Sequence, residues 1–287
     1  MVDCLGRVDF EVPENAPAAT CVATIASAGF ETLLDDMLGS LAANGACGDA
    51  ALVVLVVDGD TACARVASAH GATIVECTAR VPSNPTLKAV LYSIAHIVAA
   101  DRFLCLDADV LVLGSLEPVL AALEAAPPHA ILACPEGDKR LTLGEAFHRI
   151  YAGDAREAAR LAMKPAHAAY PLVVNDGVFA ARAEALLALD ADVRSLDAVA
   201  WVDDRPDVWW RNQFVFNLAL ARLDCGVRLD RAFNVQLHVE DVTVSRDDDG
   251  RVRARCADGV EAVVLHFGGV GRQKHPDVRG LFARVHA

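Results

Sequence analysis

The most informative absence in this 287-residue chain is that of a paired cysteine motif. Its nine cysteines are scattered, no two form a C-x-x-C pair, and most stand within apolar runs. An odd count without such spacing argues against a zinc site or a disulfide framework, and it is typical of reduced, buried thiols. We therefore expect a protein of a reducing compartment, the cytoplasm.

Positive charge is also scarce. Lys and Arg number 26 against 39 Asp and Glu, for a formal net charge of −13. This balance argues against binding along a nucleic-acid backbone and against docking on anionic lipid. The first 17 residues carry neither the basic nor the apolar segment of a signal peptide, and no apolar run approaches the length of a membrane span. The sequence predicts no transmembrane segment and leaves homo-oligomerisation open.

The first half of the chain alternates strand and helix patterns. Strands are predicted at 20–25, 51–57, 72–77 and 102–106, of which ALVVLVV (51–57) has the continuous apolar character of a strand buried on both faces. Helical patterns lie between them, including one over 85–100 that Pro85 opens. This alternation predicts an α/β fold with a Rossmann-like, doubly wound and mostly parallel sheet. Ligands of such sheets bind beyond the carboxyl ends of the strands.

The second half is less regular and predicts a mixed α+β arrangement. Helices are expected over 144–163 and 208–223, a hairpin with Asp-Gly in its turn over 242–255, and a strand over 261–267. The stretch PLVVNDGVFAAR (171–182) predicts a strand broken by a turn at Asn175–Gly177. No repeat or low-complexity linker divides the chain. We expect one domain over 1–287, with a nucleotide-binding half over about 20–114 and a half for the acceptor and donor sugar over about 115–287.

The pentapeptide LDADV occurs twice, at 106–110 and at 189–193. In the first copy, Asp107 and Asp109 follow the apolar strand RFLCL, where two unpaired carboxylates would repel each other and lose hydration unless a cation joined them. In the second copy, Asp190 and Asp192 follow a helical pattern and are predicted to form a solvated helix end. The sequence therefore predicts a metal site at the first copy only.

Further candidates for this site lie near the carboxyl terminus. His266 ends an apolar strand and is followed by a glycine-rich segment containing Gly269, Arg272 and Lys274. An imidazole, flexible backbone and two cations complement a carboxylate pair in binding a metal and a diphosphate. Taken alone, His266 fits a structural residue at a strand end better than a ligand, and only the combination favours a ligand.

Five segments, taken in order, resemble the retaining GT-A glycosyltransferases of glycosyltransferase family 8, which includes glycogenin and lipopolysaccharide galactosyltransferases. They are FLCLDADVLVLGSLEPVL, LKAVLYSI, VVNDGVFAA, RNQFVFN and HFGGVGRQK, and the similarity extends from about Cys21 to Pro276. The resemblance implies transfer of a hexose from a nucleotide sugar, a UDP-sugar above all, to an acceptor hydroxyl, with Mn²⁺ or Mg²⁺ and with retention of configuration.

The resemblance also implies roles for particular residues. The metal ligands would be Asp107, Asp109 and His266. Donor-binding residues would be Thr24, Ser27, Phe30, Lys88, Asp107, Ala108, Asp109, Asn175, Gly269, Arg272 and Lys274, and those at the transferred sugar would be Asp176, Asn212 and Gln213. The chain departs from the family pattern at Asn212, where the family has Asp, and at Asp176, where it has Ser. These two departures leave the recognition of the sugar hydroxyls open.

Other interpretations remain at this stage. Lys88 and Gln213 fit plain helix residues, and Asn175-Asp176-Gly177 fits an ordinary turn. An inverting GT-A transferase with Asp176 as the base, or a sugar-nucleotide nucleotidyltransferase, is a second enzyme hypothesis. A catalytically degenerate nucleotide-sugar-binding protein is a third hypothesis, which the Asn212 departure favours.

Overall fold

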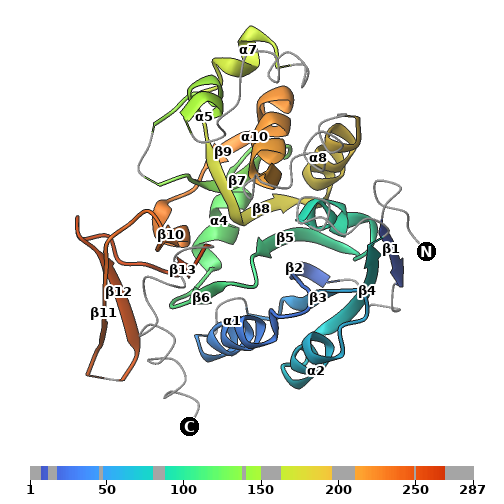
Figure 1. Ribbon diagram of the computed structural model, residues 1–287, viewed down its shortest axis with the longest axis vertical. Helices are drawn as coiled ribbons and strands as arrows, with labels where there is room; N and C mark the ends of the chain where they lie inside the picture. The colour runs from blue at the N-terminus through green and yellow to red at the C-terminus, as the bar shows by residue number, and fades with distance from the viewer. Residues whose placement is uncertain are drawn as a thin grey trace.

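The computed structural model describes residues 8–11, 18–44, 48–79, 88–137, 140–149, 163–195, 211–248 and 250–268. Its centre is an eight-stranded sheet with the strand order β1-β4-β3-β2-β5-β8-β7-β9 (Figure 1). The strands are β1 (Val8–Glu11), β2 (Ala18–Ala26), β3 (Ala51–Val57), β4 (Thr73–Ala79), β5 (Ala100–Leu106), β7 (Ile131–Pro135), β8 (Val174–Arg182) and β9 (Gly226–Arg228).

The sheet is mostly parallel, as predicted. Strands β4, β3, β2 and β5 are parallel to one another, and β7 is parallel to β9. Strand β8 runs antiparallel to both β5 and β7, and β1 runs antiparallel to β4. Strands from both halves of the sequence thus hydrogen-bond in one sheet, which confirms the predicted α/β class.

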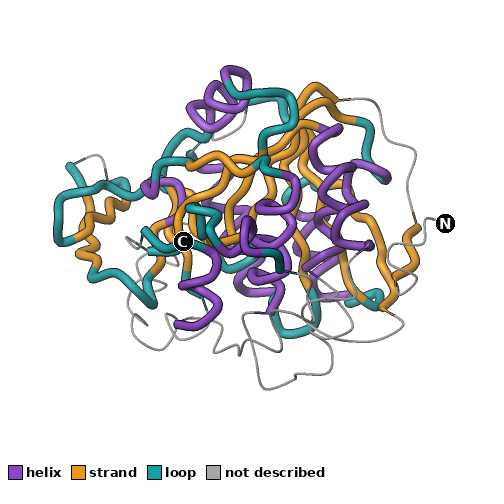
Figure 2. The backbone as a smooth tube through the Cα atoms, turned by 90° about the horizontal axis from the view of Figure 1, so that it is seen from above, coloured by secondary structure: helices purple, strands orange, loops and turns teal. Residues whose placement is uncertain are grey.

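Helices cover both faces of the sheet, which explains why its central strands are apolar throughout (Figures 1 and 2). One face packs against α1 (Glu31–Ala43), α2 (Thr61–Ala69) and α4 (Glu117–Ala125). The other face packs against η1 (Leu91–His96), α5 (Leu143–Arg149), α8 (Ala183–Ser195) and α10 (Arg211–Leu223), with α7 (Pro165–Ala168) nearby. No helix in the described part of the chain combines the length and the apolar character needed to cross a bilayer.

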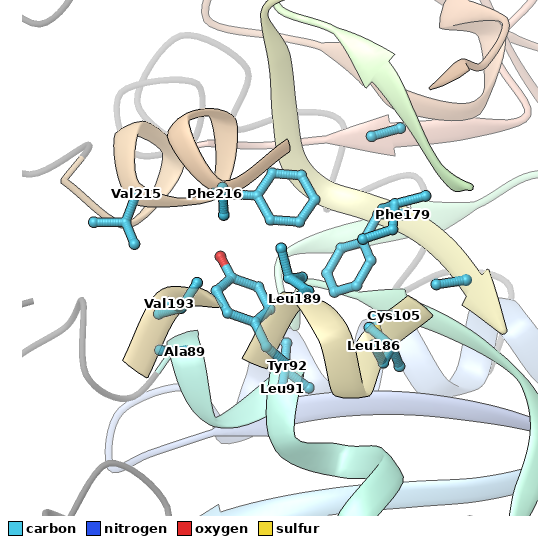
Figure 3. Packing of buried hydrophobic residues seen from close by; sticks show 14 of the residues in the cluster. Ala89, Leu91, Tyr92, Cys105, Phe179, Leu186, Leu189, Val193, Val215 and Phe216 are labelled. Carbon is cyan, nitrogen blue, oxygen red and sulfur yellow. The ribbon is translucent and has the colours of Figure 1, made fainter. Parts of the chain in front are cut away.

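An aromatic cluster fills the second layer of helices. The Tyr92 ring stacks on Phe216 with ring centroids 5.4 Å apart and meets Phe179 edge-on at 6.0 Å. Figure 3 shows Tyr92 between α8 and α10, with its hydroxyl directed toward α10. The ring is buried, so it holds its polar end in one place beneath the carboxyl edge of the sheet.

A second, three-stranded sheet builds onto this edge. Its order is β10-β13-β6, formed by β10 (Val235–Gln236), β13 (Val264–His266) and β6 (Val110–Val112), and η2 (Arg231–Asn234) leads directly into β10. In its register His266 lies opposite Val110. This pairing places the end of the last described strand beside the first LDADV copy. The predicted hairpin is also present, as β11 (Val242–Arg246) and β12 (Val252–Cys256), and projects from one side of the molecule (Figure 2).

The helix predicted over 85–100 is shorter and tighter than expected. After one helical turn at 88–90, residues Leu91–His96 form a 3₁₀ helix. A 3₁₀ helix has three residues per turn, so Ser93 and His96 lie on the same edge, and both reach the carboxylate of Asp190. The predicted helix is therefore present over 88–96, with its second part wound as a 3₁₀ helix, and it ends before the predicted residue 100, which belongs to β5. Pro85 lies outside the described residues.

The turn predicted at Asn175–Gly177 is also wrong, since these residues belong to β8. On the partner strand β7, Ala133 pairs with Phe179 whereas Cys134 pairs with Asn175, so the register shifts between them. The residues between Asn175 and Phe179 form an irregularity within the strand, where bulges re-aim side chains. Of the helix predicted over 144–163, α5 accounts for Leu143–Arg149, and 150–162 lie outside the described residues.

The second LDADV copy differs from its prediction in one respect. It does lie near the end of a helix, α8, but Asp190 is only 2% exposed. Its carboxylate accepts hydrogen bonds from Ser93 Oγ at 2.6 Å and from Arg194 Nε at 2.7 Å, and it pairs with His96. The predicted solvated helix end is wrong for Asp190, which joins α8 to η1. The seven cysteines that the structure describes are free and buried, as expected.

Candidate metal and nucleotide-sugar site

The first LDADV copy lies at the carboxyl end of β5, where the chain turns into β6. Two backbone hydrogen bonds hold this turn: Asp107 N donates to Gly177 O at 2.8 Å, and Phe267 N donates to Asp109 O at 3.0 Å. The acidic turn is thus fixed on one side by β8 and on the other by the segment after β13. Three distant parts of the sequence meet at this point.

Asp107, Asp109 and His266 form a compact triad. His266 Nε2 lies 3.6 Å from Asp107 Oδ2 and 3.3 Å from Asp109 Oδ1, and one ligand atom from each residue lies within 4.8 Å of the others. Asp109 and His266 are buried, whereas the Asp107 side chain is 23% exposed. The triad therefore has one open side.

A chain of amides fixes the orientation of the imidazole. Gly177 N donates to Asn175 Oδ1 at 2.9 Å, which identifies the oxygen of that amide, because a backbone N–H can only donate. Asn234 must then present Nδ2 to the same oxygen, at 2.9 Å, and its Oδ1 to His266 Nδ1, at 3.0 Å. Nδ1 consequently donates to Asn234, and Nε2 faces the two carboxylates.

This donor set fits a divalent cation. Two carboxylates and an imidazole nitrogen suit Mn²⁺, Mg²⁺ or a related ion, and a hydrogen-bond acceptor on the far ring nitrogen is the usual support for a metal-binding histidine. The geometry supports the predicted metal ligands.

Lys88 supplies a positive charge beside the triad. It is buried, it precedes η1 by one helical turn, and its Nζ contacts Asp107 Oδ1. Burial lowers the pKa of Lys88, and the nearby charges of Asp176 and Asp109 act in the opposite direction. Lys88 is therefore a buried residue in contact with Asp107, with the charges of Asp109 and Asp176 nearby, rather than a solvated helix residue.

A pocket of about 210 Å³ opens in front of the triad. Seven of the predicted residues line it: Ser27, Phe30, Lys88, Asp107, Ala108, Asp109 and Asn212. Ile25, Ala26 and Val57 complete the wall, at the carboxyl ends of β2 and β3. Thr24 is fully buried in β2 and is not among the lining residues.

A second polar cluster lies under β8. Asn175 Nδ2 donates to Gln213 Oε1 at 3.0 Å and to Glu136 Oε2 at 3.1 Å, and Gln213 Nε2 donates to the same carboxylate oxygen at 2.7 Å. The predicted residues Asn175 and Gln213 are thus joined, and the amide chain from His266 continues to them. Gln213 is buried rather than on the helix surface.

Glu136 is a site residue that the sequence reasoning missed. It directly follows β7, so the strand-end criterion that selected Asp107 would also have selected it. Burial raises the pKa of Glu136, but hydrogen bonds and charge from His238, Asn175 and Gln213 together outweigh burial and lower it. The group is held as a carboxylate at the end of the amide chain. Asn234 was also missed because it belongs to no motif, and Tyr92 was missed because only Lys88 of the segment LKAVLYSI was given a role.

The two departures from the family pattern touch each other. Asn212 Nδ2 donates to Asp176 Oδ2 at 2.7 Å, and Tyr92 Oη donates to the same oxygen at 3.3 Å. Asp176 is 3% exposed. Burial raises the pKa of Tyr92, and the Asp176 carboxylate raises it further, so the phenol remains a donor.

Gly177 is required by the close approach of His266 to β8. A Cβ at this position would lie 2.3 Å from His266 Cε1 and 2.6 Å from Nδ1. Only a glycine leaves room for the imidazole. Gly269, Arg272 and Lys274 lie outside the described residues, and their predicted roles stay predictions.

The fold is that of the GT-A class of glycosyltransferases. The chain is similar to the bifunctional glycosyltransferase WbbM in its apo form (TM-score 0.52, 13% identity, 79% of this chain and 41% of that chain). It is also similar to apo mouse xyloside xylosyltransferase 1 (TM-score 0.50, 16% identity, 76% of this chain and 87% of that chain). A third glycosyltransferase, LgtC with donor and acceptor sugar analogues, aligns with a TM-score of 0.49 at 16% identity, over 75% of each chain.

These similarities concern the fold. The chain spans only 41% of the length of WbbM, and every identity is 16% or lower. The sequence matches no protein-family model and no curated protein sequence.

Proposed function

We propose that this protein is a metal-dependent glycosyltransferase that moves a hexose from a nucleotide sugar to an acceptor hydroxyl with retention of configuration. The observation that carries the proposal is the triad of Asp107, Asp109 and His266, whose two carboxylates line a pocket at the carboxyl ends of β2 and β5. In a doubly wound sheet this is where a nucleotide binds. A UDP-sugar is the donor we expect first, acting in the cytoplasm.

The nucleotide would lie along the pocket wall that belongs to 20–114. Phe30 and Ser27 line the part next to β2, and the triad with Lys88 lies at the inner end. Asp107, Asp109 and His266 would hold Mn²⁺ or Mg²⁺, which supplies positive charge for the diphosphate leaving group when bound. Lys88 adds a fixed charge on the same side, and Arg272 and Lys274 are the further cations that we expect.

The transferred sugar would lie over the amide cluster, in the half formed by 115–287. Asn175 and Gln213 are locked to Glu136, so their polar groups cost no reorganisation when a sugar binds. Gln213 would support the positive charge that develops on the sugar ring from the face opposite the leaving group. This arrangement favours front-face transfer with retention, in which the departing phosphate takes the acceptor proton.

The contacts of Asp176 weigh against an inverting mechanism. An inverting enzyme needs a carboxylate base that faces the acceptor, and Asp176 is the residue we considered for it. Its carboxylate is 3% exposed and accepts hydrogen bonds from Asn212 and Tyr92, so it is not available as an open base.

A thermal-shift experiment tests the proposed donor site. UDP, GDP and ADP are added to the protein with and without Mn²⁺, and we expect a nucleoside diphosphate, UDP first, to raise the melting temperature only with the metal. Asp107→Asn should abolish the shift. Asp192→Asn, in the second LDADV copy and paired with Arg222, is the matched control and should retain it. Loss of the shift in both variants, or in neither, contradicts the proposed site.

Turnover distinguishes a transferase from a nucleotide-sugar-binding protein without activity. UDP-glucose and UDP-galactose are incubated with the protein, Mn²⁺ and a panel of sugar acceptors, and release of UDP is followed. We expect slow hydrolysis without an acceptor and faster release with a suitable one, and proton NMR of the product should show the anomeric configuration of the donor. Metal-dependent binding with no release under any condition would favour the binding protein.

A further inference from the structure

In the hydrogen bond between Asp176 and Asn212, Asn212 is the donor and Asp176 the acceptor. Asp176 lies on β8 and is buried, whereas Asn212 lies in the first turn of α10, is partly exposed and lines the pocket. The 2.7 Å hydrogen bond runs from Asn212 Nδ2 to Asp176 Oδ2. An ionised carboxylate has no proton to give, so the amide must turn its NH₂ group toward it. The remaining polar atom of Asn212 is the carbonyl oxygen Oδ1.

Asp176 is itself held in place from below. Tyr92 donates to the same Oδ2 atom, and its ring is packed against Phe179 and Phe216 (Figure 3). Lys88 lies near enough for its charge to interact with Asp176. The carboxylate therefore has a fixed position, and rotation of the Asn212 amide would bring its oxygen against Asp176 Oδ2.

We propose that Asp176 is a positioning residue that holds Asn212 with its carbonyl oxygen toward the pocket, where it accepts a hydrogen bond from a hydroxyl of the donor sugar. This inference rests on the proposed function and names how its sugar is recognised. The pair gives the pocket an acceptor without adding charge to a wall that already carries Asp107 and Asp109.

The alternative is that the pair only stabilises the contact between β8 and α10. In that case a variant would change the affinity for every ligand of the pocket equally, or for none of them. If the pair recognises the sugar, a variant changes the affinity for the nucleotide sugar but not for the nucleotide. The ratio of the two dissociation constants, Kd for the UDP-sugar over Kd for UDP, separates the two roles because any shared change cancels.

The experiment measures this ratio with Mn²⁺ by calorimetry, using UDP, UDP-glucose and UDP-galactose as the probes. The latter two differ in their 4-hydroxyl groups. The variants are Asp176→Asn, Asn212→Asp and the reciprocal double variant D176N/N212D. Asp176→Asn leaves two amides that can pair in either orientation, and Asn212→Asp places two carboxylates in contact. In the double variant an amide again faces a carboxylate, and the oxygen directed at the pocket is restored.

The comparison uses whichever of UDP-glucose and UDP-galactose binds more tightly. We expect each single variant to raise the ratio of its Kd to the Kd of UDP by roughly fivefold to tenfold, which corresponds to the loss of one hydrogen bond. The double variant should return it to within about twofold to threefold of the unmodified protein. If Asp176→Asn does not fold, the comparison of Asn212→Asp with the double variant gives the same answer, because the double variant keeps one donor and one acceptor across the contact.

The possible failures are distinguishable. If the unmodified protein does not bind UDP with Mn²⁺, the proposed function fails first and the inference falls with it. If UDP binds but neither UDP-sugar does, if the single variants leave the ratio unchanged, or if the double variant is as impaired as the worse single variant, the proposed function stands and the inference is overturned.

Discussion

Asn234 Oδ1 accepts a hydrogen bond from His266 Nδ1 over 3.0 Å, and this contact determines which nitrogen of the imidazole faces Asp107 and Asp109. The orientation originates in the backbone amide of Gly177, which fixes Asn175 and through it Asn234. A residue without any motif of its own thus prepares the histidine for metal binding.

The first prediction concerns Asn234 itself. Asn234→Leu removes the acceptor for Nδ1 and frees the ring to change its tautomer, so Mn²⁺ affinity should fall by about tenfold to a hundredfold, as measured by calorimetry. Gln236→Leu is the matched control. It lies in the next strand and removes a buried hydrogen bond to Pro135 O, so it should lower stability but leave the Mn²⁺ affinity nearly unchanged. Equal loss of affinity in both variants would contradict the role assigned to Asn234.

A second prediction follows from the crowding at Gly177. Gly177→Ala places a methyl group within 2.6 Å of two atoms of the His266 ring, so the imidazole must move away from the carboxylates. We expect loss of the Mn²⁺-dependent thermal shift. Gly114→Ala, whose added Cβ would meet only Val263 Cγ1 at an ordinary 3.5 Å, should retain it. A normal shift in Gly177→Ala would show that the site tolerates a displaced histidine.

The third prediction separates the two LDADV copies by stability. Asp190→Asn removes a buried carboxylate that accepts from Ser93 and Arg194 and pairs with His96, and it should lower the free energy of unfolding by about 1–3 kcal/mol. Urea denaturation measures the loss. Asp192 is less deeply buried, with 11% of its side chain exposed, and its side-chain partner among the described residues is Arg222, so Asp192→Asn should cost less than Asp190→Asn. The reverse order of the two losses would contradict the role of Asp190 in joining α8 to η1.

The fourth prediction is a pH dependence from Glu136. Its pKa is lowered in the folded state, so the carboxylate contributes stability that is fully present above its unfolded pKa, near the ordinary 4.5, and is lost as the pH falls below that value. The stability advantage of the unmodified protein over Glu136→Gln should therefore shrink between about pH 5 and about pH 3. Urea denaturation at each pH gives the difference. An advantage that stays constant or grows in acid would rule out a lowered pKa.

Several features could be predicted because they depend on neighbours in the sequence. The run ALVVLVV contains no polar residue that could face water, so it is stable as a strand buried in the sheet. Asp107 and Asp109 follow such a strand directly, and any parallel sheet brings strand ends to one edge. The two carboxylates of the proposed metal site could be selected for that reason.

The surroundings of Asp190 and Glu136 could not be predicted from the local sequence. Asp190 and Asp107 stand in identical LDADV pentapeptides. The burial of Asp190, however, depends on Ser93 and His96, which are almost a hundred residues away in the sequence. Glu136 has its role because Asn175, Gln213 and His238 converge on it from three other segments. Neither environment is visible in the local pattern, since burial and hydrogen-bond partners are set by long-range packing.

The sequence by itself determined the α/β class, most of the strands and the carboxylate pair, because side-chain periodicity and strand-end position are local properties. The tertiary structure alone decided which nitrogen of His266 faces that pair, that Asp190 is buried, and that Asp176 and Asn212 are in contact. Those outcomes depend on the directions of hydrogen bonds between segments far apart in the chain, and such directions are fixed only when the segments pack together.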